Sequence, residues 1–199
     1  RGIDVTDLER DWTHANSLVF DPERQAIIVS VRHTDQLIAL DFTEELGPQT
    51  GVRWIVGAAG TVPYEGESFH HTHGAMVDTD GSIVLYDNGN FRPGTVLAGG
   101  EAAPYSRAVR IEVDDRSDDP ADWTARQVWD HVLEDPKTGT PAFAPFVSDA
   151  DALPNGNILV THGGLGGLTS FQHIHILEYV PEGERNGDVV WELQLGVPG

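Results

Sequence analysis

The chain has 199 residues, of which 39% are hydrophobic, and its 32 acidic against 12 basic side chains give a formal charge of −20. This charge argues against nucleic acid as a partner because it repels polyanions. The absence of cysteine excludes disulfides and thiolate metal sites. No apolar run reaches the roughly 18 residues of a membrane span. Because the chain is so negatively charged, any site that binds a small anion needs positively charged groups of its own.

Gly 22 and Pro 12 favour an all-β chain with many turns. The first of three similar segments runs from about residue 16 to 57. Its predicted strands are residues 17–20, 26–30, 36–41 and 52–56. A turn at Asp21-Pro22 separates the first two strands, and Trp54 lies in the last one.

The second and third segments, at about 72–132 and 147–195, repeat this order. The second contains predicted strands at 75–77, 82–86, 107–113 and 127–130, and the third at 149–153, 157–160, 175–180 and 189–193. Residues 122–129 resemble a helix, but Trp129 corresponds to the tryptophan that closes the other segments, which predicts a strand. Insertions at 58–71, 90–104 and 135–146 make the spacing irregular and are candidates for functional loops.

Four short strands repeated in tandem predict the blades of a β-propeller. Because propellers typically need about 4–8 blades, three cannot close a ring. The chain begins at Arg1 and ends at Gly199 without the features of natural termini. We therefore expect a fragment of a longer chain, with six blades in the complete ring. A homo-oligomer that completes the ring is the alternative.

Two histidines and a serine occupy corresponding places in the three segments. His14 precedes the innermost strand of the first, His73 that of the second, and Ser148 that of the third. Innermost strands line the central channel of a propeller, so these side chains are expected to converge there. The alternative for any single histidine is a structural or solvent-exposed role.

Metal binding has weaker support. His71 and His73 could share one face of an extended chain, as could His173 and His175. No carboxylate stands beside them at a familiar ligand spacing, so we assign no metal. Arg107, in a Gly- and Pro-flanked segment, presents the planar fork of donors that suits sulfate or carboxylate, with an ordinary ion pair as the alternative.

Several segments, in order along nearly the whole chain, resemble those of the arylsulfotransferase family of bacterial propeller enzymes. They are D-W-T-H-A-N-S at 11–17, R-H at 32–33 ahead of strand 36–41, T-H-G-A at 72–75, L-Y-D-N-G at 85–89, Y-S-R-A-V at 105–109, Q-V-W at 127–129, F-V-S-D at 146–149 and L-P-N-G-N at 153–157. Thr72, where the family usually has Gln, is a departure from the pattern.

The resemblance implies a ping-pong reaction in which a histidine takes the sulfuryl group of a phenolic sulfate and passes it to a second phenol. No adenylyl sulfate cofactor is implied, in agreement with the lack of a phosphate-binding glycine loop. Arg107 would neutralise charge on the sulfuryl oxygens, and Asn88 would donate a hydrogen bond, although an Asn-Gly pair also suits a plain turn. His14 and His73 would donate hydrogen bonds or exchange the phenolic proton.

The nucleophile is assigned to His175 by alignment of the third segment, with His173 and His162 as alternatives. The Gly-rich link at 165–172 is longer than the family pattern leads one to expect. Analogy with the family also implies a periplasmic or secreted protein. Two rival functions stay open. One is a metal-dependent propeller hydrolase or lactonase that uses Asp149 and Asp151, and the other is a non-catalytic propeller that binds a partner.

Overall fold

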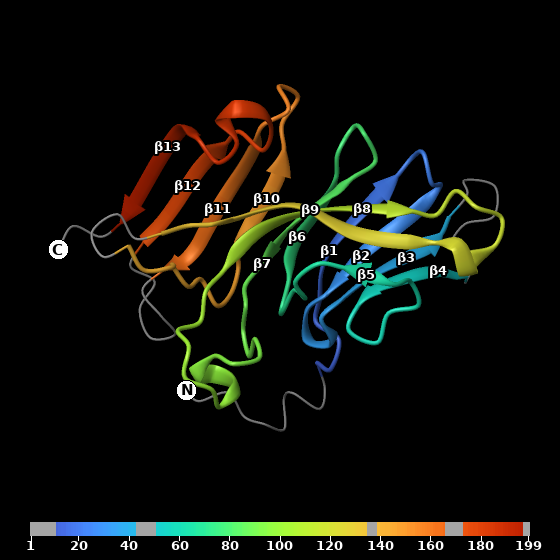
Figure 1. Cartoon of the computed structure of the whole chain (residues 1–199), viewed down its shortest axis with the longest axis horizontal. Helices are drawn as coiled ribbons and strands as arrows, with labels where there is room; N and C mark the ends of the chain where they lie inside the picture. The colour runs from blue at the N-terminus through green and yellow to red at the C-terminus, as the bar shows by residue number, and fades with distance from the viewer. Residues whose placement is uncertain (1–10, 43–50, 135–138, 166–172, 197–199) are drawn as a thin grey trace.

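The computed structural model describes residues 11–42, 51–134, 139–165 and 173–196, which form three β-sheets arranged side by side (Figure 1). The first sheet consists of β1 (Ala15–Asp21), β2 (Ala26–Val31), β3 (Gln36–Asp41) and β4 (Val52–Gly57). The second consists of β6 (His73–Val77), β7 (Ile83–Asp87), β8 (Arg107–Asp114), β9 (Thr124–Val132) and the short β5 (Tyr64–Glu65). The third consists of β10 (Asp149–Ala152), β11 (Ile158–Leu165), β12 (His173–Tyr179) and β13 (Val189–Gly196).

The prediction of an all-β chain is confirmed, and the strands of each predicted segment form one sheet. Consecutive strands pair antiparallel within each sheet, as expected for strands joined by short turns. The additional strand β5, which was not predicted, lies in the insertion at 58–71 and pairs parallel with β9. Of the helix-like run at 122–129, residues 124–129 belong to strand β9, and Asp122 ends a 3-10 turn at Pro120–Asp122.

Other 3-10 turns lie at Arg32–Thr34, Val96–Ala98 and Gly183–Arg185. Within the described ranges no helix has the length and apolar character needed to cross a membrane.

The middle sheet is buried on both faces. Along β7, Ile83 and Leu85 join the core shared with the first sheet, whereas Val84 and Tyr86 join the core shared with the third. All four are fully buried, and each buried large side chain stabilises the fold by roughly 1.5–3 kcal/mol. Because successive side chains of β7 point to opposite faces of its sheet, this one strand contributes to both cores and links the three sheets.

Tryptophans on the outer strands connect each sheet to the next. Trp54 of β4 donates its indole N–H to Asp115, which directly follows β8 of the second sheet, at 3.1 Å. Trp129 of β9 donates to Asn186, just before β13 of the third sheet, at 3.0 Å. Trp191 of β13 is 46% exposed, and the described chain places no further sheet over it.

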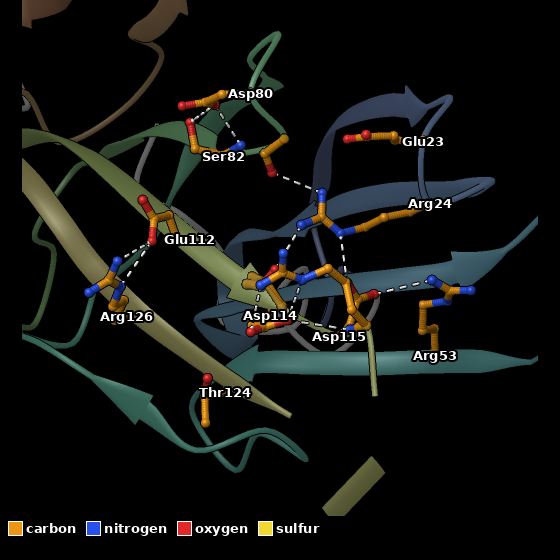
Figure 2. A pocket seen from close by; sticks show the side chains of 13 residues that line it. Glu23, Arg24, Arg53, Asp80, Ser82, Glu112, Asp114, Asp115, Thr124 and Arg126 are labelled. Atoms are coloured by element: carbon orange, nitrogen blue, oxygen red, sulfur yellow. Dashed lines mark hydrogen bonds and ion pairs between the residues drawn. The ribbon is translucent and has the colours of Figure 1, made fainter. Parts of the chain in front are cut away.

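A cleft of about 880 Å³ lies between the first two sheets, near the β1–β2 turn. Figure 2 shows Arg24 and Arg53 reaching across it to Asp115. Arg24 Nε lies 3.1 Å from Asp115 Oδ1, and Arg53 Nη1 lies 3.2 Å from Asp115 Oδ2. Asp115 is nearly buried, so these charges hold the sheets together at the end of the molecule opposite the starts of β1 and β6.

The starts of the innermost strands meet at that other end. β6 contacts both β1 and β10. Asn16 donates to the Thr72 carbonyl at 2.6 Å, and the Ala75 N–H donates to Ser17 at 3.0 Å. At Gly74, which has φ +58°, a Cβ atom would stand 1.8 Å from Asp149 Oδ1, so glycine permits the close approach of β6 to β10.

Candidate active site

His73 and Asn88 form the best-defined polar pair at the strand starts. Asn88 donates its side-chain amide to the carbonyls of Ala144 at 2.7 Å and Val147 at 3.1 Å. These two acceptors orient the amide so that its oxygen faces His73 Nδ1, 2.6 Å away. Because an amide oxygen can only accept, His73 Nδ1 carries the proton, and in the neutral ring Nε2 has a free lone pair.

The surroundings favour that neutral ring. Burial lowers the pKa of His73 and outweighs the opposing effects of its hydrogen bonds with Asn88 and with the His71 backbone, and the charges of Arg32 and His14 lower it further. His73 is therefore an uncharged imidazole near neutral pH.

Ser148 brings the third sheet to the same end. Its hydroxyl accepts a hydrogen bond from the Gly163 N–H at 3.0 Å. Ser148 and Val147 both have positive φ, as do His14 and His71 at this end. Left-handed backbone is unfavourable for such residues, above all for a β-branched valine, and tends to concentrate at functional sites.

His14 lies just before β1, in contact with the carboxylate of Asp11. His33 Nδ1 donates to the Asp11 carbonyl at 2.6 Å, and the His14 and His33 rings lie 4.8 Å apart. The hydrogen bond from His14 lowers the pKa of Asp11. Asp11, His14 and His33 form the single group of three or more potential metal ligands among the described residues. The adjacent Arg32 charge opposes a cation there, so we assign no metal.

Asp35 holds the segment before β6. It accepts the His71 N–H at 2.7 Å and lies 3.3 Å from His70 Nδ1. Burial opposes ionisation of Asp35, but these imidazole and backbone hydrogen bonds prevail and keep its pKa well below the ordinary value. The His71 ring lies 5.7 Å from that of His33, which continues a row of imidazoles along this end.

Arg107, predicted to contact the sulfuryl group, is fully buried and its N–H groups are occupied. Nε donates to Asp87 at 2.9 Å, and Nη1 donates to Glu67 at 2.9 Å and to Asp130 at 3.2 Å. Nη2 donates to the carbonyls of Glu67 and Ser68. Burial disfavours the charge, yet the surrounding carboxylates raise the pKa of Arg107. In this state the guanidinium serves a buried ion-pair network.

The candidate nucleophiles lie in the third sheet. His175 and His162 pair across β11 and β12, and His175 Nε2 lies 2.6 Å from a carboxylate oxygen of Glu192. His162 Nδ1 lies 2.8 Å from the Tyr86 hydroxyl. Burial lowers the pKa of His162 to about 3, so its ring is neutral. His173 begins β12, and its side chain lies outside the described residues, as do residues 166–172 of the Gly-rich link.

The structure therefore brings His14, His73, Asn88 and Ser148 to one end of the three sheets. It places Arg107 in a neighbouring buried network and His175 against Glu192. Sequence reasoning assigned no role to Asp11, Arg32, His33 or Asp35. Asp11 lies in the D-W-T-H segment, and Arg32 and His33 form the R-H segment. Their place in these family-like segments is the sequence feature that could have identified them.

Asp149 and Asp151, the ligands expected of a metal hydrolase, alternate along β10. Burial raises the pKa of both. In the part of the chain that the structure describes, neither belongs to a group of three potential metal ligands.

Comparison with known proteins agrees with the family resemblance. The profile of the arylsulfotransferase (ASST) family matches residues 2–195. Arylsulfate sulfotransferase AssT of Escherichia coli O6:H1 is 23% identical, over 78% of this chain and 28% of its own length. This chain thus spans little more than a quarter of that relative.

Among solved structures, the PQQ-bound form of aldose sugar dehydrogenase from Streptomyces coelicolor matches 85% of this chain and 45% of its own, with 14% identity and a TM-score of 0.44. A likeness at this level carries no inference about fold or function. The family match, by contrast, covers nearly every residue, and this chain belongs to the arylsulfotransferase family.

Proposed function

We propose that this chain contributes the site of an arylsulfotransferase, which moves a sulfuryl group from a phenolic sulfate to a phenol through a sulfohistidine. The observation that carries the proposal is the His73–Asn88 pair, held at the same end as His14, in segments of the sequence that resemble those of the family. No nucleotide sulfate donor enters the proposal.

His73 is the proposed proton acceptor. Its Nδ1 proton is committed to Asn88, so Nε2 is free to take the proton of the acceptor phenol as that oxygen attacks sulfur. Asn88 gives its amide protons to two backbone carbonyls, which makes it a positioning residue for His73. His14 is proposed as a hydrogen-bond partner for a phenolic oxygen.

His175 is the proposed nucleophile, with His173 and His162 as alternatives. Donation of the Nε2 proton to Glu192 leaves a lone pair on His175 Nδ1. In the first step this nitrogen forms a bond to sulfur while the donor's S–O bond breaks and its phenolate leaves. In the second step the acceptor oxygen takes the sulfuryl group and the N–S bond breaks. As in phosphoryl transfer, the protein contributes mainly positioning and charge stabilisation.

We also propose that the three sheets are blades of a larger propeller, in a periplasmic or secreted protein. The repeated contact of an outer-strand tryptophan with the following sheet supports this architecture, because Trp54 and Trp129 both make it. In a complete ring a further blade would cover Trp191.

The test uses the full-length protein with p-nitrophenyl sulfate and excess phenol, without added metal or nucleotide, and follows nitrophenol release by absorbance. We expect release that depends on the acceptor, is abolished in His175→Ala, and falls strongly in His73→Gln. His131→Gln, a half-buried ring outside the site, is the matched control.

If activity survives in His175→Ala but is lost in either His162→Ala or His173→Ala, the histidine whose replacement abolishes activity is the nucleophile. Absence of release from the folded protein with several phenols would overturn the transferase and favour the partner-binding or metal-hydrolase functions. A bound-metal measurement would then separate those two.

A further inference from the structure

Regular strand pairing does not by itself fix the position of His73. β6 and β7 pair at His73 with Tyr86 and next at Met76 with Val84, so the pairing advances by three residues on β6 but by two on β7. Because such a bulge leaves one residue out of the ladder, the backbone around His73 is held less firmly than that of a regular strand. Further contacts are needed to keep the imidazole against Asn88.

Asp87 supplies contacts on both sides of the His73–Asn88 pair. Its Oδ1 atom accepts the N–H of Gly89 at 3.0 Å, which turns the chain tightly around Asn88. The same oxygen accepts the N–H of His70 at 2.8 Å, from the segment that leads into His73. The Gly89 N–H also donates to the His70 carbonyl at 2.9 Å. One carboxylate oxygen therefore joins the two segments that carry the imidazole and its amide partner.

Two arginines hold the other oxygen of Asp87. Arg92 Nη2 donates to Oδ2 at 2.7 Å, and Arg107 Nε donates to it at 2.9 Å. The carboxylate is completely buried, and a buried charge is tolerated only when it is paired and hydrogen-bonded. Because both oxygens are bonded, on one side to the backbone and on the other to guanidinium groups, the orientation of the carboxylate is fixed.

Two of the insertions that interrupt the repeat complete this arrangement, since one contains Glu67 and the other Arg92. Glu67 accepts Arg92 Nη1 at 2.5 Å on one oxygen and Arg107 Nη1 at 2.9 Å on the other. The Arg92 guanidinium also lies over the ring of Tyr105, 4.2 Å from its centre. These contacts set the spacing of the two guanidinium groups that hold Asp87.

We propose that Asp87 is a positioning residue that holds the His73 imidazole in place, with its Nδ1 bonded to the Asn88 oxygen. Asp87 acts through backbone N–H groups and does not contact a substrate. The inference rests on the proposed function for the part that His73 takes in sulfuryl transfer, whereas the positioning itself rests on the hydrogen bonds of Asp87. Positioning matters for the rate because a misplacement of about 1 Å can slow a reaction about 100-fold.

Asp87→Asn tests the proposal because an amide matches only half of this environment. Its oxygen can accept from the backbone, but its NH2 group then faces the donors of the two arginines. Asp21→Asn is the matched control. Asp21 is also completely buried, accepts the N–H groups of Glu23 and Arg24, and pairs with Arg24 Nη1 at 2.6 Å, but it lies at the far end of β1 from His73.

The first measurement is the ring ¹⁵N spectrum of the full-length protein labelled at histidine, in which the His73 signals are identified by their loss in His73→Gln. In the wild type we expect one neutral tautomer, with the proton on Nδ1. In Asp87→Asn we expect a mixture of both tautomers, because the ring no longer faces Asn88 in a fixed orientation. Asp21→Asn should lose stability but keep the wild-type tautomer, which separates positioning from a general structural effect.

The second measurement is turnover of p-nitrophenyl sulfate with excess phenol. In Asp87→Asn we expect kcat to fall at least about tenfold, because His73 is misplaced. The KM for the sulfate ester should stay within about twofold of the wild-type value, because groups that bind the ester are unchanged. Asp21→Asn should retain the wild-type kcat.

A wild-type tautomer of His73 in folded Asp87→Asn would overturn the proposal, and so would equal changes in Asp87→Asn and Asp21→Asn. If Asp87→Asn does not fold, Arg92→Gln decides, because it leaves Arg107 on the carboxylate. A mixture of tautomers in this variant supports the proposal, and a wild-type spectrum overturns it. If the wild type transfers no sulfuryl group, the proposed function fails, and the tautomer comparison still decides whether Asp87 positions His73.

Discussion

The Nδ1 proton of His73 is bonded to the side-chain oxygen of Asn88, at 2.6 Å. This contact sets which nitrogen of His73 faces the site with a lone pair. It also connects the second sheet to residues 144–147 through the amide of Asn88.

Asn88→Asp tests that relationship. A carboxylate beside His73 favours the imidazolium, so we expect the pKa of His73 to rise by at least about one unit. The acid limb of the pH–rate profile should move to higher pH by a similar amount, because the basic form then requires a higher pH. NMR titration of the His73 ring gives the pKa, with the His131 ring in the same spectrum as an internal control. A His73 pKa equal to that of the wild type would show that Asn88 does not face it.

Arg107→Gln should unfold the protein more easily, whatever its effect on catalysis. The change removes one of the two arginines that pair with the buried carboxylate of Asp87 and leaves Arg92. This loss is expected to cost about 3–5 kcal/mol of unfolding free energy. Arg116, paired with Asp114 at the surface, is the matched control, and Arg116→Gln should leave the midpoint of urea unfolding unchanged. Equal midpoints for both variants would contradict the structural role assigned to Arg107.

Gly74→Ala is expected to disturb the approach of β6 to β10. Gly156→Ala introduces only the left-handed backbone cost of about 1–2 kcal/mol, since nothing lies near its new methyl group. Gly74→Ala has that cost and also brings Cβ against Asp149, and such overpacking adds about 1–3 kcal/mol. Urea unfolding of the two variants measures the difference. Equal losses of unfolding free energy in the two variants would mean that β6 and β10 can move apart at that point without energetic cost.

His162 should make the protein less stable in mild acid. Its folded pKa is about 3, below the unfolded value of about 6.5, so between these values the unfolded chain binds a proton that the folded chain does not. The free energy of unfolding should therefore fall by about 1 kcal/mol per pH unit as pH drops from 6 to 4. Urea unfolding of wild type and His162→Leu over this range isolates the effect, because all other groups are common to both. If the unfolding free energies of the two proteins changed with pH in the same way, His162 would have to be protonated in the folded protein.

The strands and the places of His14, His73 and Ser148 were predictable because both depend on local pattern. Period-two alternation and Asp-, Gly- and Pro-rich turns are properties of a few consecutive residues. Once the innermost strand of each segment is known, the residues that precede those strands must meet at one end.

The partners of the charged side chains were not predictable in the same way. Arg107 is bonded to Glu67, 40 residues earlier, and Arg32 to the Pro145 carbonyl, 113 residues later. The two arginines look alike in sequence, and only the tertiary structure shows that Arg107 is hydrogen-bonded to carboxylates whereas Arg32 is hydrogen-bonded to a backbone carbonyl.

The sequence alone thus determined the all-β architecture, the threefold repeat and the family, because periodicity, turn residues and ordered segments are written along the chain. The tertiary structure alone decided which nitrogen of His73 keeps a lone pair, which arginine has its N–H groups hydrogen-bonded to protein oxygens, and which carbonyls accept the amide of Asn88. Those properties depend on hydrogen-bond partners from different sheets, and such partners come together only when the sheets pack.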